Sequence, residues 1–203
     1  MLLARGGIEG HGQEVLSRAR SLGLVVKEAT TRRGSPQSYL DALRESAPAD
    51  IIDVRFHIPQ EFLRLLYRAS DCVLANSGHE PFGLVGLEAM AAGGIVFAGC
   101  TGEDYAIPFV NAFVLETADP EEIAGYVTYL HEYPEEAARM RKAARRTARL
   151  FTWEAATQNL IGRVENQARM QRIMRGKPVA EEPPFVVPQL TDIVLAGIRD
   201  IPA

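Results

Sequence analysis

Short apolar runs alternate along this chain with segments of helical periodicity. The runs are rich in Leu, Ile, Val and Phe and lie at Leu2–Arg5, Leu24–Val26, Ile51–Val54, Cys72–Ala75, Ile95–Ala98 and Ala112–Leu115. Apolar strands without polar alternation are typical of parallel sheets that are covered on both faces. The alternation of such strands with helices predicts a Rossmann-like, doubly wound α/β fold, in which ligands bind at the carboxyl ends of the strands.

Polar caps and first-turn prolines mark the starts of the helices between these runs. Ser35 and Pro36 precede one helical pattern, and Pro59 precedes another. Asp119 is followed by Pro120 and two glutamates, which places three helix-start signals together. We therefore expect a helix after each of these positions.

The pattern changes from about Pro134, where long helical segments follow one another without a strand. Thr152 is the expected cap of the last helix, from Trp153 to about Arg175. The remaining residues carry five prolines among apolar side chains, which predicts an extended arm. The expected organisation is an α/β domain at 1–150, a carboxyl-terminal helix at 151–176 and a Pro-rich tail at 177–203.

Charge and composition narrow the class of protein. A formal net charge of -4 and a pI of about 5.6 provide no general field that would attract nucleic acid or an anionic bilayer. No apolar run is long enough to cross a membrane, and the first residues do not resemble a signal peptide. The two cysteines fit a reducing compartment. We therefore expect a cytoplasmic protein, with no nucleic-acid partner and no indication of membrane association.

A strand–loop–helix unit between Cys72 and Gly94 places two glutamates around a helix start. Glu80 lies just before the helix, and Glu88 lies two turns into it. The first N–H groups of a helix lack intrahelical acceptors, so the backbone near Gly83 is suited to an anion such as a diphosphate. Carboxylates on either side of that anion favour a ligand with a sugar at each end, which describes a nucleotide sugar. The alternative is that both glutamates are solvent-facing helix charges.

The same residues resemble glycosyltransferase family four, whose members are retaining enzymes of GT-B architecture. The family motif consists of two glutamates separated by seven residues, with Phe-Gly-Leu after the first glutamate. Here it reads EPFGLVGLE from Glu80 to Glu88 and continues as AMAAG. The resemblance extends from about Leu2 to Gln167, through FHIPQEFLRLLYRASD before the motif and TGEDYAIPFVNAF after it. It implies the carboxyl-terminal donor-binding domain of such an enzyme.

The resemblance assigns roles to the residues of this motif. Glu80 is expected to contact the hydroxyl groups of the donor sugar and is the catalytic candidate, while Glu88 is expected to bind the ribose. His79 is expected to touch the donor. The sugar and the diphosphate would be held by the backbone amides of Phe82, Gly83, Leu84 and Val85. Catalysis then consists of orienting the sugar and stabilising the departing diphosphate, and it requires no metal ion or cofactor.

Three further residues follow strands and are candidates for the donor cleft. Gly7 lies in GGIEGHG, which is compatible with a phosphate loop and with a plain tight turn. His57 follows Phe56 where the family holds the nucleotide base, but a packed aromatic and a surface histidine explain the pair equally well. Thr101 opens an acidic turn, where its hydroxyl or the backbone would contact a pyrophosphate; the alternative is an ordinary turn. The scatter of the histidines argues against a zinc site.

Two features leave alternatives open. The basic helical segment Arg139–Arg149 is compatible with a solvated face and with contact to an anionic lipid or acceptor.

The strand, Arg/Lys pair and helix that open the family's domain do not precede Leu2. We therefore expect a truncated chain, an incomplete gene product or half of a two-chain enzyme, whose acceptor domain is a separate or missing partner. A non-catalytic sugar-nucleotide-binding or regulatory module and a GT-B-like epimerase are the alternative functions.

Overall fold

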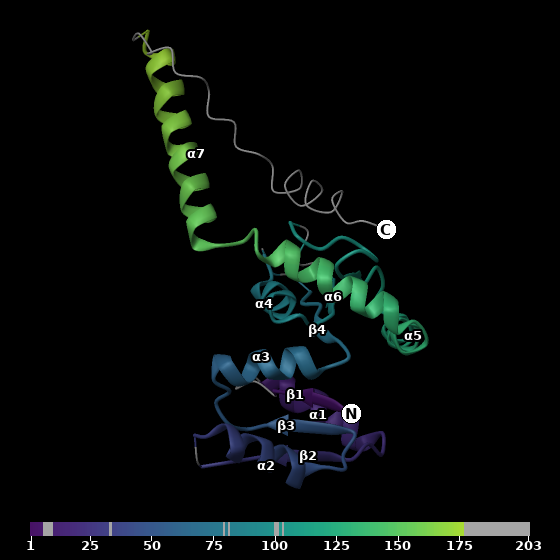
Figure 1. The fold of residues 1–203 in the computed structure, drawn as a ribbon. Helices are drawn as coiled ribbons and strands as arrows, with labels where there is room; N and C mark the ends of the chain where they lie inside the picture. Colours follow the sequence, from purple (N-terminus) through teal and green to yellow (C-terminus); the bar gives the residue numbers. More distant parts are fainter. Residues whose placement is uncertain are drawn as a thin grey trace. The chain divides into compact units, whose positions relative to one another are not determined.

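Two compact units make up the part of the chain that is described. The computed structural model describes residues 1–5, 10–32, 34–78, 80, 82–99, 102 and 104–176, which form seven helices and six strands (Figure 1). The units are Met1–Leu63 and the chain from Arg64 onward. Each contains a three-stranded parallel sheet. The parallel α/β class is therefore confirmed, with the described strands in two sheets. The division at residue 150 stays a prediction, and the tail at 177–203 lies outside the described residues.

The first unit is built around its central strand. Its elements are β1 (Leu2–Ala4), α1 (Gly10–Ser21), β2 (Val26–Ala29), α2 (Pro36–Ser46), β3 (Ile51–Val54) and the beginning of α3 (Gln60–Ala69). β3 lies between β1 and β2 and pairs in parallel with both. Every residue of β3 is buried, and Ile51 packs with Leu16 and Ala19 of α1. The core of this unit therefore forms around the strand that has no exposed position.

The start of α2 follows the prediction from its cap. The Ser35 and Ser38 hydroxyls each accept the other residue's backbone N–H at 3.2 Å, which is a capping box. Tyr39 of α2 stacks on Phe56, with ring centroids 5.0 Å apart, and also contacts Phe62 at 5.1 Å. Phe56 is therefore a packed core aromatic.

Helix α1 is an element that the sequence pattern does not reveal. Gly10 and Gly12 are typical of a loop, but they form the first turn of this helix. Glycine weakens a helix interior by up to about 1 kcal/mol per residue relative to alanine. Leu16 and Ala19 are buried against the sheet. The burial of apolar side chains stabilises the folded state by an amount comparable to the destabilisation caused by the glycines, and so offsets it.

Strand β2 begins later than the apolar run predicts. The expected strand is Leu24–Val26, whereas the observed ladder is Val26–Ala29. The N–H of Val25 donates to the Asp50 carboxylate at 2.7 Å, and its carbonyl accepts the N–H groups of Asp50 and Ile51. Val25 is thus tied to the turn that enters β3, and the regular pairing starts one residue later.

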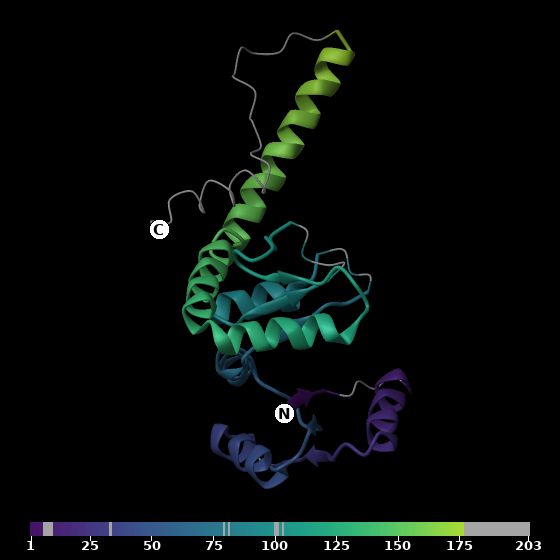
Figure 2. The same ribbon diagram turned by 90° about the vertical axis from the view of Figure 1, so that its right-hand side faces the viewer.

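Figure 2 shows the second unit from another direction. Its elements are the end of α3, β4 (Val73–Ala75), α4 (Leu84–Ala92), β5 (Val96–Ala98), β6 (Phe113–Val114), α5 (Pro120–Glu132), α6 (Pro134–Ala148) and α7 (Trp153–Met174). β5 is buried and lies between β4 and β6. α4 and α6 lie side by side (Figures 1 and 2). The helix starts at Asp119 and Thr152 are capped as the sequence predicts.

Two apolar clusters form the core of the second unit, and β5 contributes to both. Val96 and Ala98 belong to the cluster with α4 and α6, whereas Phe97 belongs to a cluster with β6, α5 and α6. This division follows from the alternation of side chains along a strand. Cys72 is partly buried and packs against the cluster that contains Phe97; Cys100 lies outside the described residues.

α7 is the longest described helix and carries several exposed apolar side chains, including Trp153 with 90% of its surface exposed. Across the described ranges, every helix is too short or too polar to cross a membrane.

A buried asparagine fixes the segment between β5 and β6. The Asn111 amide nitrogen donates to the Tyr105 carbonyl at 2.8 Å and to the Thr147 hydroxyl at 2.9 Å. Its amide oxygen accepts the Ile107 N–H at 2.6 Å. Asn111 is completely buried. Its side chain therefore provides the hydrogen bonds that the Tyr105 carbonyl and the Ile107 N–H would otherwise make with water, and it connects this segment to Thr147 of α6.

We predict that Asn111→Ala lowers the free energy of unfolding by about 2–4 kcal/mol, because it leaves the Ile107 N–H and the Tyr105 carbonyl buried without their partner. Urea unfolding followed by circular dichroism measures the change. The control is Asn159→Ala, which removes a half-buried amide whose oxygen accepts one solvent-exposed hydrogen bond from Arg163; this change should cost less than about 0.5 kcal/mol. Equal losses in the two variants would contradict the role of Asn111.

Candidate functional site

The candidate site lies at the start of α4, the helix that connects the paired parallel strands β4 and β5 along the chain. Gly83 is the residue before the helix and has φ 78° and ψ 64°, in the left-handed region. Glycine adopts this conformation without the steric cost that a Cβ atom brings. The sequence therefore places its glycine at the position where the chain turns into the helix.

The amino end of α4 has no side-chain cap among the described residues. Gly83 has no side chain to accept the N–H groups of the first turn, and the N–H groups of Leu84, Val85 and Gly86 precede the first intrahelical bond. Leu84 and Val85 are exposed, at 59% and 42%. The positive end of the helix dipole therefore lies next to solvent at Leu84 and Val85, while Gly86 is buried; an exposed, uncapped helix start is suited to binding an anion.

The opposite end of α4 is capped by arginine. Arg141 of α6 donates from Nη1 to the Gly93 carbonyl at 2.8 Å and from Nη2 to the Ser70 carbonyl at 2.8 Å. The guanidinium of Arg145 lies directly against Gly93, where a Cβ atom would collide with it. Burial is the main cause that lowers the pKa of Arg141. Positive charge here stabilises the negative end of the helix dipole, so α4 is capped at one end and open at the other.

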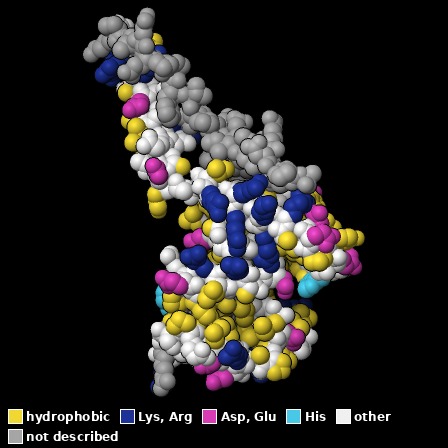
Figure 3. Space-filling model, viewed as in Figure 1, with side chains coloured by type: hydrophobic (Ala, Val, Ile, Leu, Met, Phe, Trp, Pro, Cys, Tyr) yellow, Lys and Arg dark blue, Asp and Glu magenta, His cyan; other side chains and the backbone are white. Residues whose placement is uncertain are grey.

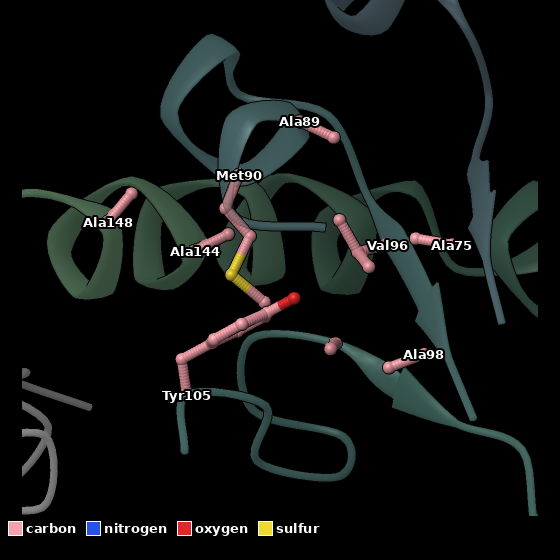
Figure 4. Close-up of a cluster of buried hydrophobic side chains, with 9 residues drawn as sticks. Ala75, Ala89, Met90, Val96, Ala98, Tyr105, Ala144 and Ala148 are labelled. Carbon is pink, nitrogen blue, oxygen red and sulfur yellow. The ribbon is translucent and has the colours of Figure 1, made fainter. Parts of the chain in front are cut away.

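Tyr105 lies beneath the open end of α4. Figure 4 shows its ring beside Met90 of α4, in the cluster that includes Val96 and Ala144. The Tyr105 hydroxyl donates to the Gly83 carbonyl. Burial and then the negative charge of Glu80 raise the pKa of Tyr105 to about 12, against the opposing effect of a hydrogen bond from the Leu87 backbone. The hydroxyl therefore stays protonated and remains a donor throughout the physiological pH range.

The two glutamates of the motif lie on the same structural unit. Glu80 is half-buried before the helix, and its charge acts on the Tyr105 hydroxyl. Glu88 is exposed on α4, and its charge is the second cause, after burial, that raises the pKa of Tyr67. Each carboxylate thus raises the pKa of one tyrosine of the same unit, and Glu88 is the more exposed of the two.

The strand–loop–helix unit brings together the residues that carry the sequence motif, namely Glu80, Phe82, Gly83, Leu84, Val85 and Glu88. His57 belongs to the first unit and is exposed. The predicted contacts of Gly7, His79 and Thr101 lie outside the described residues. The site assignments therefore stay predictions, supported for the motif by the open helix end.

The described residues bear in part on the expectations that the histidines are scattered and that the chemistry uses no metal ion. His11 lies near the start of α1, where it pairs with Glu14 at 3.5 Å and is largely exposed. The described residues contain no group of three or more His, Cys, Asp or Glu that could hold a metal ion. The expectation that the chemistry uses no metal stays a prediction.

The basic segment of α6 combines both structural and solvent-facing residues. Figure 3 shows Lys and Arg side chains gathered over this helix. Lys142 and Arg149 are exposed, in agreement with a solvated face. Arg141 is half-buried and bonded to backbone carbonyls, and Arg139 bonds Glu136 and the Phe109 carbonyl. The segment is therefore partly a structural clamp, a role that neither sequence interpretation includes.

Tyr105 is the residue of this site that the sequence motif does not identify. A Cβ atom on Gly86 would lie 2.5 Å from the Tyr105 hydroxyl oxygen, so Gly86 makes room for the ring. A glycine inside an otherwise apolar helix is a recognised sign of close packing. The sequence therefore indicates close packing at Gly86, but it does not identify Tyr105 as the residue that packs there.

We predict that Gly86→Ala lowers the free energy of unfolding by about 2 kcal/mol, because the new methyl group overlaps the Tyr105 hydroxyl oxygen. In a Tyr105→Phe background the oxygen is absent and the next atoms lie 3.3 Å away, so the same change should cost less than about 1 kcal/mol. Urea unfolding of the four proteins in this double-mutant cycle measures the coupling.

Gly125→Ala is the control for this cycle, since a Cβ atom at that position on α5 meets nothing within 4 Å. It should be neutral or stabilising by about 1 kcal/mol in both backgrounds because alanine favours a helix. An equal cost of Gly86→Ala with and without the hydroxyl would show that the ring does not fill this space.

Known proteins with similar sequences are glycosyltransferases and sugar-phosphate synthases. A D-inositol 3-phosphate glycosyltransferase from Thermobispora bispora is 31% identical over 146 residues, which cover 71% of this chain and 34% of the relative. A mannosylfructose-phosphate synthase from Agrobacterium fabrum is 29% identical over 137 residues, covering 65% of this chain and 28% of the relative. The chain spans about a third of the length of the curated relatives it matches.

Solved structures share the fold. Sucrose-phosphate synthase from Thermosynechococcus elongatus matches with a TM-score of 0.52 and 26% identity, covering 72% of this chain and 38% of that protein. HepE from Anabaena, solved in complex with UDP and glucose, matches with a TM-score of 0.50 and 19% identity, covering 75% and 52%. The family described as glycosyl transferases group 1 matches residues 34–147, which include the whole of α4 and the Tyr105 segment. The match spans more than half of the sequence, and this chain belongs to the glycosyl transferases group 1 family.

Proposed function

We propose that this chain is the donor-binding part of a glycosyltransferase, which binds a nucleoside-diphosphate sugar and transfers the sugar with retention of its anomeric configuration. The observation that carries the proposal is the uncapped amino end of α4 behind the left-handed Gly83, with Glu80 before it and Glu88 beyond it. Membership of the glycosyl transferases group 1 family supports the same reaction class.

The diphosphate would bind at the backbone amides of Leu84 and Val85, which are the exposed residues of the first turn of α4. These groups have no intrahelical acceptor and belong to a helix that packs in the core, so they can stabilise negative charge with little rearrangement. The negative charge on the diphosphate grows as the bond to the sugar breaks. Donors that are already oriented therefore stabilise the transition state more than the bound substrate, which lowers the barrier.

The glutamates would bind the two ends of the donor. A carboxylate accepts hydrogen bonds from vicinal hydroxyl groups, and the ribose and the transferred sugar both provide them. We assign the sugar to Glu80, because it is half-buried and lies next to the open helix end, and the ribose to Glu88, which is exposed. The Anabaena protein HepE, which shares the fold, was solved with UDP and glucose, and this supports the class of ligand.

Positioning is the main source of catalysis in this proposal. Both motif carboxylates are assigned to hydroxyl groups, and the proposed reaction uses neither a metal ion nor a cofactor. Orientation of two reactants removes entropy from the barrier and contributes several kcal/mol on its own. We assign acceptor binding to a separate part of the enzyme, since the curated relatives are about three times as long as the span matched here. The low cysteine content supports a cytoplasmic location.

We predict that the protein binds UDP or another nucleoside diphosphate. Glu88→Ala should weaken this binding by about tenfold, because the ribose hydroxyls lose a charged acceptor whose hydrogen bonds contribute about 1.4 kcal/mol. Isothermal titration against a panel of nucleoside diphosphates and their sugars measures both quantities. Glu135→Ala is the matched control, since Glu135 is an exposed glutamate in the first turn of α6. The absence of binding for the whole panel would overturn the proposed function.

We also predict that Glu80→Gln removes the preference for the nucleotide sugar over the free nucleotide and leaves the affinity for the nucleotide within about twofold, because only the sugar end loses its charged acceptor. The same titrations, made with paired ligands such as UDP and UDP-glucose, give the ratio. Equal weakening of both ligands would place Glu80 at the phosphates or in the fold, and would contradict its assignment to the sugar.

A further inference from the structure

Tyr105 is held in one position by contacts on all sides. Its ring packs against Phe82 and Phe151, with centroids 5.5 and 6.0 Å apart. Its backbone carbonyl accepts a hydrogen bond from the buried Asn111. Two glycines leave room for the ring, since a Cβ atom would lie 2.5 Å from its oxygen at Gly86 and 3.0 Å from its Cζ atom at Gly102. A buried aromatic with this many constraints holds its hydroxyl at a fixed point.

The hydroxyl acts on one peptide unit of the candidate site. It donates to the carbonyl of Gly83, and that carbonyl belongs to the same planar peptide as the N–H of Leu84. The carbonyl and the N–H of a trans peptide point in opposite directions. A carbonyl directed at the buried Tyr105 therefore directs the Leu84 N–H away from the core, toward the exposed side of the helix end.

The need for an external constraint follows from the residues that form this turn. Gly83 has φ 78° and no side chain, so its peptide is freer to rotate than that of any other residue. A helix cap with a Ser, Thr or Asp side chain normally restricts this end. Here the Tyr105 hydroxyl supplies the restriction from the core side, through its hydrogen bond to the Gly83 carbonyl.

We propose that Tyr105 is a positioning residue of the donor site, whose hydroxyl fixes the Gly83–Leu84 peptide so that the Leu84 N–H is directed at the donor diphosphate. The identity of the ligand rests on the proposed function, whereas the orientation of the peptide rests on the contacts above. Tyr105 acts through the backbone of Gly83 and touches no reacting atom.

The test is Tyr105→Phe, which keeps the ring and removes the hydroxyl. We expect the Leu84 amide signal in a ¹H–¹⁵N spectrum to move and the exchange of the Leu87 amide, in the first turn of α4, to speed up about tenfold, since about 1.4 kcal/mol of stabilisation is lost there. Affinity for UDP should fall about tenfold, whereas affinity for uridine, which lacks phosphate, should stay within twofold.

Tyr126→Phe is the matched control. Tyr126 is also partly buried in an aromatic cluster, but its hydroxyl faces Glu122 on α5 at 3.4 Å. This variant should leave the Leu84 signal, the Leu87 exchange and the ratio of UDP to uridine affinity at their wild-type values.

Three results are informative. Unchanged Leu84 and Leu87 amides in Tyr105→Phe would overturn the orienting role. Changed amides with an unchanged ratio of UDP to uridine affinity would overturn its contribution to diphosphate binding. If the wild-type protein binds no nucleoside diphosphate, the proposed function fails, and the two amides still decide whether Tyr105 orients the peptide.

Discussion

The burial of α4 against α6 is the constraint on which the second unit depends. α4 carries one ionisable residue, Glu88, and its sequence LVGLEAMAA is otherwise apolar or small. Ala89 and Met90 of α4 pack with Ala144 and Ala148 of α6 around Tyr105. Burial of a side chain the size of Met90 contributes about 2 kcal/mol, and small side chains on both helices permit close approach. The axis of α4 is therefore fixed by apolar packing, independently of any ligand.

Because packing fixes the axis of α4, the two ends of this helix are where its contacts differ. Arg141 and Arg145 occupy the carboxyl end of α4, where their charges stabilise the fold. At the amino end no described side chain caps the helix, and Tyr105 holds the Gly83 carbonyl from the core. One helix thus combines a carboxyl end held by arginines with an amino end whose residue before the helix, Gly83, supplies no side-chain cap. Under the proposed function, a capping side chain at that end would compete with the diphosphate for the same amides.

Much of this arrangement follows from the sequence because it is local. The caps at Ser35, Asp119 and Thr152 depend on the residues next to them and are found where they are expected. The motif helix is delimited by Gly83 and Gly93, both with positive φ. Helix α1 escapes prediction because its stability comes from contacts with the sheet, which outweigh two unfavourable glycines. Tyr105 escapes for the same kind of reason, since 22 residues separate it from the carbonyl that it holds.

The arginine clamp also has a consequence for the order in which the molecule is assembled. Arg141 follows Gly93 by 48 residues, so the carbonyl at the end of α4 has no arginine partner when α4 itself is synthesised. At roughly 5–20 residues per second, translation adds those residues in about 2–10 s. During that interval α4 and β5 carry apolar surface that α6 will later cover. The nascent chain thus passes through a stage in which α4, the most apolar of the described helices, does not yet have its cover from α6.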